Sequence, residues 1–294
     1  MRRSPTRSAS RIAALLGLLL AACSRSDTPA APASLGAPRR IVALTVGSVD
    51  TLALLGELGR VVAVEEDCFV PGTEQLARIQ NDDHAGPSKA LSVESVLALA
   101  PDLVIAKEEL RGALEGRGVD VLWISPASDL PAIERIVEEI GARVGVPEKA
   151  RRLVAELDER ARLVAARVAG IAAVRVYYEA GRPGRSAGRH TVIDAMIRLA
   201  GGVNIAGAEE LASPTLSSEA IVAADPEVIV LSPWSDAPAD VAARPGWERI
   251  AAVRAGRVYR LDERDRKVGY PSPSCVEGCE RLLLPWLHPE VAGR

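Results

Sequence analysis

Two segments of the chain repeat one pattern. Residues 91–105 read LSVESVLALAPDLVI and residues 216–230 read LSSEAIVAADPEVIV, so the same Leu, Ser, Glu, Ala and Pro recur at the same spacing. Each copy begins with a serine suited to cap a helix, carries an acid in the first turn, and has a proline where the helix must end. The apolar run after the proline is typical of a strand buried in a parallel sheet. The repeat therefore predicts two similar α/β lobes.

Strand-like and helix-like segments alternate on both sides of the repeated unit. The other expected strands lie at 40–44, 61–65, 119–125, 174–180 and 256–262. The other expected helices lie at 49–58, 130–144, 192–200 and about 274–287. This alternation predicts mainly parallel sheets covered by helices on both faces. The N-terminal lobe is expected to span 39–146 and the C-terminal lobe 171–294.

One long helix is expected between the lobes, over residues 147–170. Pro147 suits the first turn of a helix and Gly170 a stop. Apolar residues between them form one stripe, and charged residues form i, i+4 pairs on the other faces. Such a helix is a rigid connector between lobes, or else a helix that belongs to one lobe.

The first 23 residues have the pattern of an export signal. Four arginines precede an apolar run, IAALLGLLL, which is shorter than the ~20 residues that span a bilayer as a helix. The run ends in LAAC, which resembles the lipobox of bacterial lipoproteins and makes Cys23 the expected lipidation site. The alternative is an ordinary secretory signal with a chance cysteine. Residues 24–38 are rich in Ser, Ala and Pro and are expected to form a flexible tether. The body would then lie in an extracytoplasmic space, anchored to a bacterial membrane at the periplasm or cell surface.

Charge and motifs limit the class of function. The chain has 36 Lys and Arg against 39 Asp and Glu, so nothing favours a nucleic-acid partner. No GxSxG, HExxH, P-loop or dinucleotide fingerprint occurs, which disfavours an enzyme and gives no reason to expect a required cofactor. We expect a monomeric binding protein that touches the membrane through its lipid anchor only.

Several segments together resemble one family. PRRIVALTVGSVDTLALLGELGRVVAV at 38–64, IDAMIRLAGGVNIA at 193–206 and RPGWERIAAVRAGRVYRLD at 244–262 are similar to the helical-backbone substrate-binding proteins of ABC importers. The likeness runs in order from Pro38 to Pro289. It implies two α/β lobes joined by one long helix, with a ligand cleft between the lobes. It also implies capture of a metal chelate and delivery to an ABC permease with its ATPase. An iron–siderophore is the favoured ligand, with haem or cobalamin as alternatives. A stand-alone haem- or metal-binding lipoprotein without a permease is the second hypothesis.

The same resemblance gives Glu94 and Glu219 a role. The family carries one glutamate on each lobe that docks with permease arginines, and these two acids hold the matching positions of the repeat. The alternative is that both are first-turn acids favoured by the helix dipole, worth ~0.3–1 kcal/mol.

Ligand contacts are expected from loops at strand ends that face the other lobe. The candidate residues are Thr45, Val46, Gly47, Ser48, Cys68, Phe69, Arg182, Arg185, Arg189, His190, Trp234, Arg264, Arg266 and Tyr270. The cations among them favour an anionic ligand, such as a carboxylate siderophore or the propionates of haem. The alternative is that these arginines are only solvated. Cobalamin is less favoured, since the tryptophans expected before Leu91 and Leu216 are missing.

Besides Cys23, the chain has three cysteines, so at least one of them cannot form a disulfide within the chain. Cys275 and Cys279 share a helix face, where a disulfide between them would be strained. Cys68 and Cys275 are expected beside the cleft. They are interpreted as an inter-lobe disulfide, as buried free thiols, or as soft metal ligands together with His190.

Overall fold

A computed structural model describes residues 37–80, 91–262 and 265–291. The predicted signal, Cys23 and most of the predicted tether lie outside the described residues, as does Arg264. Within the described ranges, no helix combines the length and the apolar character needed to cross a membrane.

The first lobe contains a five-stranded parallel sheet in the order β3-β2-β1-β4-β5. Its strands are β1 (Ile41–Ala43), β2 (Val61–Glu65), β3 (Ala77–Ile79), β4 (Leu103–Lys107) and β5 (Val121–Ile124). The helices α1 (Val46–Leu54) and α4 (Leu130–Arg143) share one core with the sheet, whereas α2 (Val93–Ala98) and α3 (Arg111–Leu114) share another. The strands are therefore buried on both faces, as their continuous apolar sequences predict.

The second lobe contains a four-stranded parallel sheet in the order β7-β6-β8-β9. Its strands are β6 (Val174–Glu179), β7 (Gly202–Asn204), β8 (Val228–Leu231) and β9 (Val258–Arg260). The helix α6 (Val192–Leu199) covers one face, and α7 (Ser218–Ala224), α8 (Pro238–Ala242) and α9 (Ala251–Arg254) pack on the other. The predicted fold class, two similar lobes of parallel sheet, is confirmed.

The repeated sequence unit has the same local structure in both lobes. Ser92 and Ser217 each cap their helix by accepting a hydrogen bond from a backbone amide three residues on. The residue before each proline is left-handed, with φ of 45° at Ala100 and 43° at Asp225. Such a turn ends each helix abruptly and sends the chain directly into β4 or β8.

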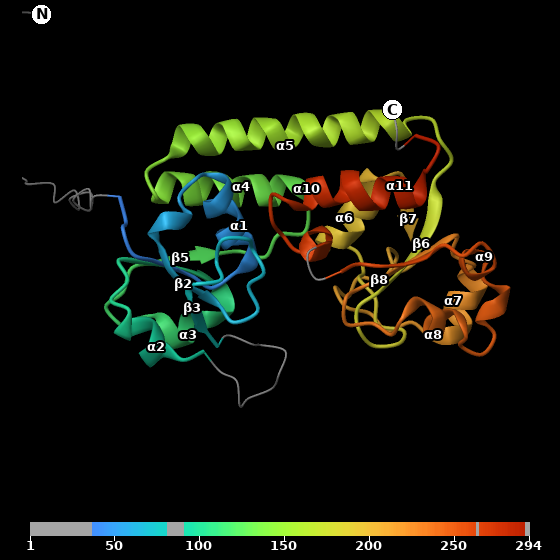
Figure 1. Cartoon of the computed structure of the whole chain (residues 1–294), viewed down its shortest axis with the longest axis horizontal. Coiled ribbons are helices and arrows are strands. Elements are labelled where there is room, and N and C mark those ends of the chain that lie inside the picture. The colour runs from blue at the N-terminus through green and yellow to red at the C-terminus, as the bar shows by residue number, and fades with distance from the viewer. Residues whose placement is uncertain (1–36, 81–90, 263–264, 292–294) are drawn as a thin grey trace, which may run out of the picture. The chain divides into compact units, whose positions relative to one another are not determined.

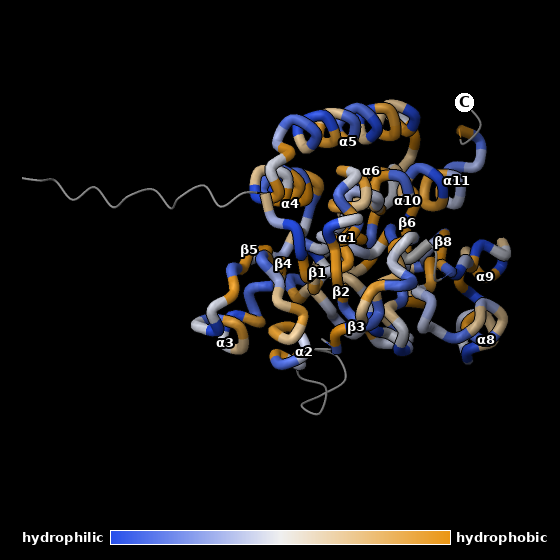
Figure 2. The backbone as a smooth tube through the Cα atoms, turned by 60° about the vertical axis from the view of Figure 1, so that its left-hand side comes forward, coloured by the Kyte–Doolittle hydropathy of each residue, from blue (hydrophilic) through white to orange (hydrophobic). Residues whose placement is uncertain are grey.

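The helix α5 (Pro147–Val168) lies along both lobes and packs against α4, α6 and α10 (Cys275–Gly278) (Figure 1). Its turns alternate between hydrophilic and hydrophobic residues (Figure 2). Near its start, Lys149 binds Glu57 of the first lobe at 2.8 Å. Farther along, Arg167 binds Glu280 of the second lobe at 3.4 Å. The helix ends slightly before Gly170, because Ala169 is already extended.

The lobes also touch directly, through the last helical segment of the chain. This segment consists of α10 (Cys275–Gly278), a π-helical turn (Cys279–Leu283) and α11 (Leu284–Leu287). Just before it, the backbone N–H and the hydroxyl of Ser274 donate to the carboxylate of Asp50 in α1, at 3.0 and 2.8 Å. Nearby, a Cβ at Gly47 would overlap the carbonyl oxygen of Pro271. The connector helix is therefore not the only attachment between the lobes.

Asp50 is 4% exposed, so its two hydrogen bonds replace water that cannot reach it. We predict that Asp50→Ala lowers the free energy of unfolding by about 2–3 kcal/mol, since hydrogen bonds to charged groups are the stronger ones. Urea unfolding measures this, with the exposed Asp240→Ala as a control that changes little. A double-mutant cycle with Ser274→Ala should give a coupling of about 1 kcal/mol or more. Zero coupling would contradict the stabilising role of this contact.

Candidate ligand-binding site

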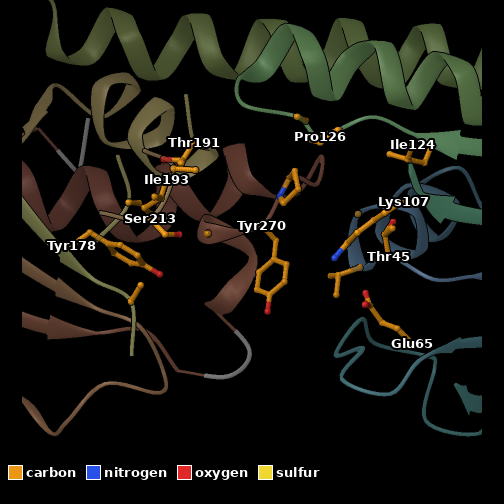
Figure 3. Close-up of a pocket in the computed structure, with 18 of the residues that line it drawn as sticks. Thr45, Glu65, Lys107, Ile124, Pro126, Tyr178, Thr191, Ile193, Ser213 and Tyr270 are labelled. Carbon is orange, nitrogen blue, oxygen red and sulfur yellow. The ribbon is translucent and has the colours of Figure 1, made fainter. Parts of the chain in front are cut away.

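A cleft of about 510 Å³ lies between the lobes, at the carboxyl ends of strands from both sheets (Figure 3). From the first lobe, Thr45 follows β1, Lys107 ends β4 and Ile124 ends β5. From the second lobe, Tyr178 and the residues after it close the opposite wall. Parallel strands bring their carboxyl ends to one edge of a sheet, which is where α/β folds bind ligands. The cleft has this location in both lobes at once.

The first wall is built around the start of α1. Thr45 is the helix N-cap, and its hydroxyl oxygen accepts from the backbone N–H of Ser48 at 3.0 Å. The Ser48 hydroxyl returns a hydrogen bond to the Thr45 carbonyl at 2.9 Å. These reciprocal bonds fix the polar groups that line this side. Lys107, Glu65 and Glu109 add charges of both signs to the same cleft.

The second wall depends on a buried ion pair. Glu179, at the end of β6, has no exposed surface, and Arg244 donates to its two carboxylate oxygens at 2.6 and 3.0 Å. Tyr177 donates its hydroxyl to the same carboxylate at 3.1 Å. The backbone N–H of Gly184 donates to it at 3.4 Å. Because the Glu179 carboxylate binds the backbone N–H of Gly184, it helps to fix the position of the residues that follow Gly184 and line the cleft.

The backbone of that loop has no room for a side chain at Gly184. Its φ is +79°, and a Cβ there would overlap the carbonyl oxygen of Leu216. Farther along, the Ser186 hydroxyl donates to the Tyr178 carbonyl at 2.7 Å. Arg185 and Ser186 therefore face the cleft from a loop with fixed backbone.

Aromatic rings stand across the cleft. Tyr270 lies between the two walls, with the Tyr178 side chain on the second-lobe side (Figure 3). Burial raises the pKa of Tyr178, so its hydroxyl stays protonated as a hydrogen-bonding group. Trp234 lines the cleft while 57% of its surface is exposed. Rings of this kind offer flat apolar contacts with polar edges.

Only some of the ligand-binding residues predicted from the sequence line the cleft. Those that line the cleft are Thr45, Val46, Gly47, Ser48, Arg185, Trp234 and Tyr270. Those that lie outside its lining are Cys68, Phe69, Arg182, Arg189 and His190. For Arg266, only the backbone lies within the described structure.

Most of the cationic residues that the sequence predicts as ligand contacts in the loop after β6 do not line the cleft. Arg182, Arg189 and His190 are exposed, and Arg189 is paired with Glu210 at 3.1 Å. The described part of the cleft instead has Arg185 and Lys107 balanced by Glu65 and Glu109. A strong preference for anions does not follow from this arrangement.

The cysteines also differ from one expectation. Cys68, Cys275 and Cys279 are all free and buried, so the inter-lobe disulfide is not formed. Burial raises the pKa of Cys275 to about 12, and it also raises that of Cys68. No cluster of three or more His, Cys, Asp or Glu able to hold a metal occurs among the described residues. Buried free thiols are the interpretation that agrees with the structure.

Several residues that line the cleft were not predicted from the sequence. The largest omission is the end of β5, where Ser125, Pro126 and Ala127 line the cleft together with Lys107 at the end of β4. Tyr178, Thr191 and Ser213 were missed in the second lobe. The strand-end rule, applied to every strand, would have found Lys107, Tyr178 and the β5 loop. Ser213 has no such signal.

Glu94 and Glu219 lie outside the cleft. Both are exposed in the first turns of α2 and α7, the equivalent helices of the two lobes. Figure 1 shows these helices on the side of their lobes away from α5. The two carboxylates are therefore available to a partner.

Comparisons with known proteins agree with this architecture. The sequence matches the model of the periplasmic binding protein family over residues 41–264. It is 30% identical over 259 residues to a cobalamin-binding protein of Halobacterium salinarum, covering 83% of this chain and 68% of that protein. It is 27% identical over 257 residues to the uncharacterized ABC transporter substrate-binding lipoprotein YvrC of Bacillus subtilis, covering 83% of this chain and 79% of that protein.

A solved structure gives the same result. The apo form of the periplasmic heme-binding protein RhuT from Roseiflexus sp. RS-1 has a TM-score of 0.73 and 25% identity, covering 84% of this chain and 97% of that one. The family match extends across both sheets and the helix α5 that lies along them. The chain belongs to the periplasmic binding protein family.

Proposed function

We propose that this protein is the substrate-binding component of an ABC importer and that its cleft captures a metal tetrapyrrole. The observation that carries the proposal is the composition of the cleft, where aromatic rings and hydroxyls surround a space of about 510 Å³ and the charges of the described lining residues are balanced. A tetrapyrrole has a flat apolar ring and polar groups at its edge. Tyr270 and Trp234 suit the flat ring, since aromatic faces stack on it. Arg185 and Lys107 suit carboxylate or phosphate groups at the edge.

Relatives support this ligand class. The Halobacterium salinarum protein is named for cobalamin and the Roseiflexus protein for haem, and these two ligands are both metal tetrapyrroles. The name of the Bacillus subtilis relative supports the importer role, with a permease and an ATPase as partners. The family supports an extracytoplasmic location and a binding protein rather than an enzyme.

A ferric siderophore is the second candidate ligand. Arg185 and Lys107 favour it, because carboxylate siderophores are anionic. Against it, Arg182 and Arg189 are exposed outside the cleft, and Glu65 and Glu109 line it. Among the described side chains, the cleft therefore offers fewer cations to such a ligand than the sequence suggests.

Titration of the full-length protein with haemin, cyanocobalamin and ferric dicitrate tests the ligand class. We expect a tetrapyrrole to bind at least tenfold more tightly than ferric dicitrate, a difference of about 1.4 kcal/mol. Trp234→Ala should weaken that binding about fivefold to tenfold, since an aromatic contact is worth about 1 kcal/mol. The matched control is Trp123→Ala, because Trp123 lies in β5 outside the cleft lining. Tighter binding of ferric dicitrate would refute the tetrapyrrole class.

Anchoring through Cys23 belongs to the same proposal, because a tether keeps the carrier near its permease. We predict that Cys23→Ser moves the protein from the membrane fraction to the soluble extracytoplasmic fraction, since the lipid supplies the membrane affinity. Cell fractionation and blotting measure this, with Ser26→Ala in the tether as a control that stays membrane-bound. An unchanged distribution of the Cys23→Ser protein would argue against lipidation.

Docking through Glu94 and Glu219 is the remaining part of the proposal. Two exposed carboxylates, one on each lobe, can pair with cations of a permease and orient the cleft over it. We predict that the double variant Glu94→Lys/Glu219→Lys reduces cellular uptake of the bound ligand at least about tenfold, since like charges at an interface are strongly unfavourable. The Kd of the purified protein for its ligand should not change.

A charge-matched control separates docking from general electrostatics. Glu156→Lys/Asp240→Lys makes the same charge change at exposed positions on α5 and α8. Uptake should remain normal in this control. Equal loss of uptake in both double variants, or no loss in either, would exclude a specific role for Glu94 and Glu219.

A further inference from the structure

A second cavity lies close to the ligand cleft. It has a volume of about 650 Å³ and is lined by residues of both lobes, including Phe69 and Pro71 from the first and Lys267, Gly278 and Leu282 from the second. Phe69 lines this cavity but not the cleft, and Tyr270 lines the cleft but not this cavity. The two rings meet edge to face, with centroids 5.3 Å apart and planes at 68°. The Phe69–Tyr270 pair therefore forms part of the partition between the two spaces.

The backbone on the Phe69 side of the partition is fixed. The Arg78 guanidinium donates to the carbonyl of Cys68 at 2.8 Å. The Thr73 hydroxyl donates to the carbonyl of Val70 at 2.7 Å. The ring of Phe69 thus projects from a loop that is held on both sides.

The backbone on the Tyr270 side is fixed as well. The Tyr270 N–H donates to the carbonyl of Lys267 at 3.2 Å, and its own carbonyl accepts from the Ser272 N–H at 2.8 Å. The next residue, Pro271, is packed against Gly47. Because the backbone of Tyr270 is held, its side chain can move mainly by rotating about its own bonds. The Phe69 ring blocks this rotation in one direction.

We propose that Phe69 is a positioning residue that limits ligand size by holding Tyr270 across the cleft; this rests on the proposed tetrapyrrole function. While the pair is intact, the ligand is confined to the cleft. When the Phe69 ring is removed, Tyr270 can turn toward the second cavity and the two spaces join. The intact partition therefore favours haemin, a flat macrocycle, over cyanocobalamin, which carries a bulky nucleotide loop beside its ring.

Binding selectivity tests this role. In Phe69→Ala, the ratio of the Kd for cyanocobalamin to the Kd for haemin should fall at least about fivefold, consistent with loss of one edge-to-face pair. Phe69→Tyr keeps the ring and should leave the ratio within about twofold of the wild type. The matched control is Trp286→Ala, which removes a stacked pair with Tyr259 outside both cavities and should not change the ratio. An unchanged ratio in Phe69→Ala would overturn the proposal.

A second measurement needs no ligand. Phe69 is the only phenylalanine of the chain, so para-fluorophenylalanine labelling gives a single fluorine resonance. In the ligand-free protein, Tyr270→Leu should shift this resonance, whereas Tyr259→Leu should not. No shift with Tyr270→Leu would overturn the pairing, whatever the ligand. If the wild type binds neither probe, the tetrapyrrole function fails, and the size-limiting role fails with it even where the resonance establishes the pair.

Discussion

The cleft depends on the direct contact between α1 and the segment that leads into α10. Asp50 binds Ser274 through two hydrogen bonds, and Gly47 lies against Pro271 without room for a side chain. Gly47 and Pro271 are also part of the cleft lining. The contact that joins the lobes is thus continuous with the site, and a large change in the angle between the lobes would break these hydrogen bonds.

The lobes are further restrained by a common core. Apolar residues of both sheets, such as Ile105 in β4 and Val230 in β8, belong to one buried cluster with Leu157 and Val164 of α5. Opening the cleft widely would expose part of this cluster to water, at ~25 cal/mol for each Å² of apolar surface. Ligand capture is therefore expected to use small rotations and side-chain movements rather than a large hinge motion.

Local sequence predicts the parts of this fold that depend on neighbouring residues. The serine caps, the prolines after α2 and α7 and the apolar strands are all readable within one repeat, and they give the two-lobed architecture. The strand β3 was not predicted, because Ala77 and Arg78 are exposed and only Ile79 is buried, so no apolar run marks it. Its position at the sheet edge allows such a sequence.

The site was less predictable, because side-chain directions in loops depend on distant residues. Arg185 faces the cleft, whereas Arg182, in the same loop, is exposed. What fixes this loop is the bond between Glu179 and Arg244, which are 65 residues apart in the chain. Nothing local to the loop encodes that pairing.

The same reasoning explains why the sequence favours an anionic ligand whereas the structure does not. A count of arginines favours an anion, but charge acts on a ligand only where the side chain reaches the cleft. Arg182 and Arg189 are exposed outside the cleft, and among the described side chains that line it the carboxylates of Glu65 and Glu109 offset the cations of Arg185 and Lys107. We therefore expect shape and ring contacts to distinguish ligands more than net charge does. On the proposed function, Tyr270 and the Phe69 ring that contacts it have a larger part in selection than any single charged residue.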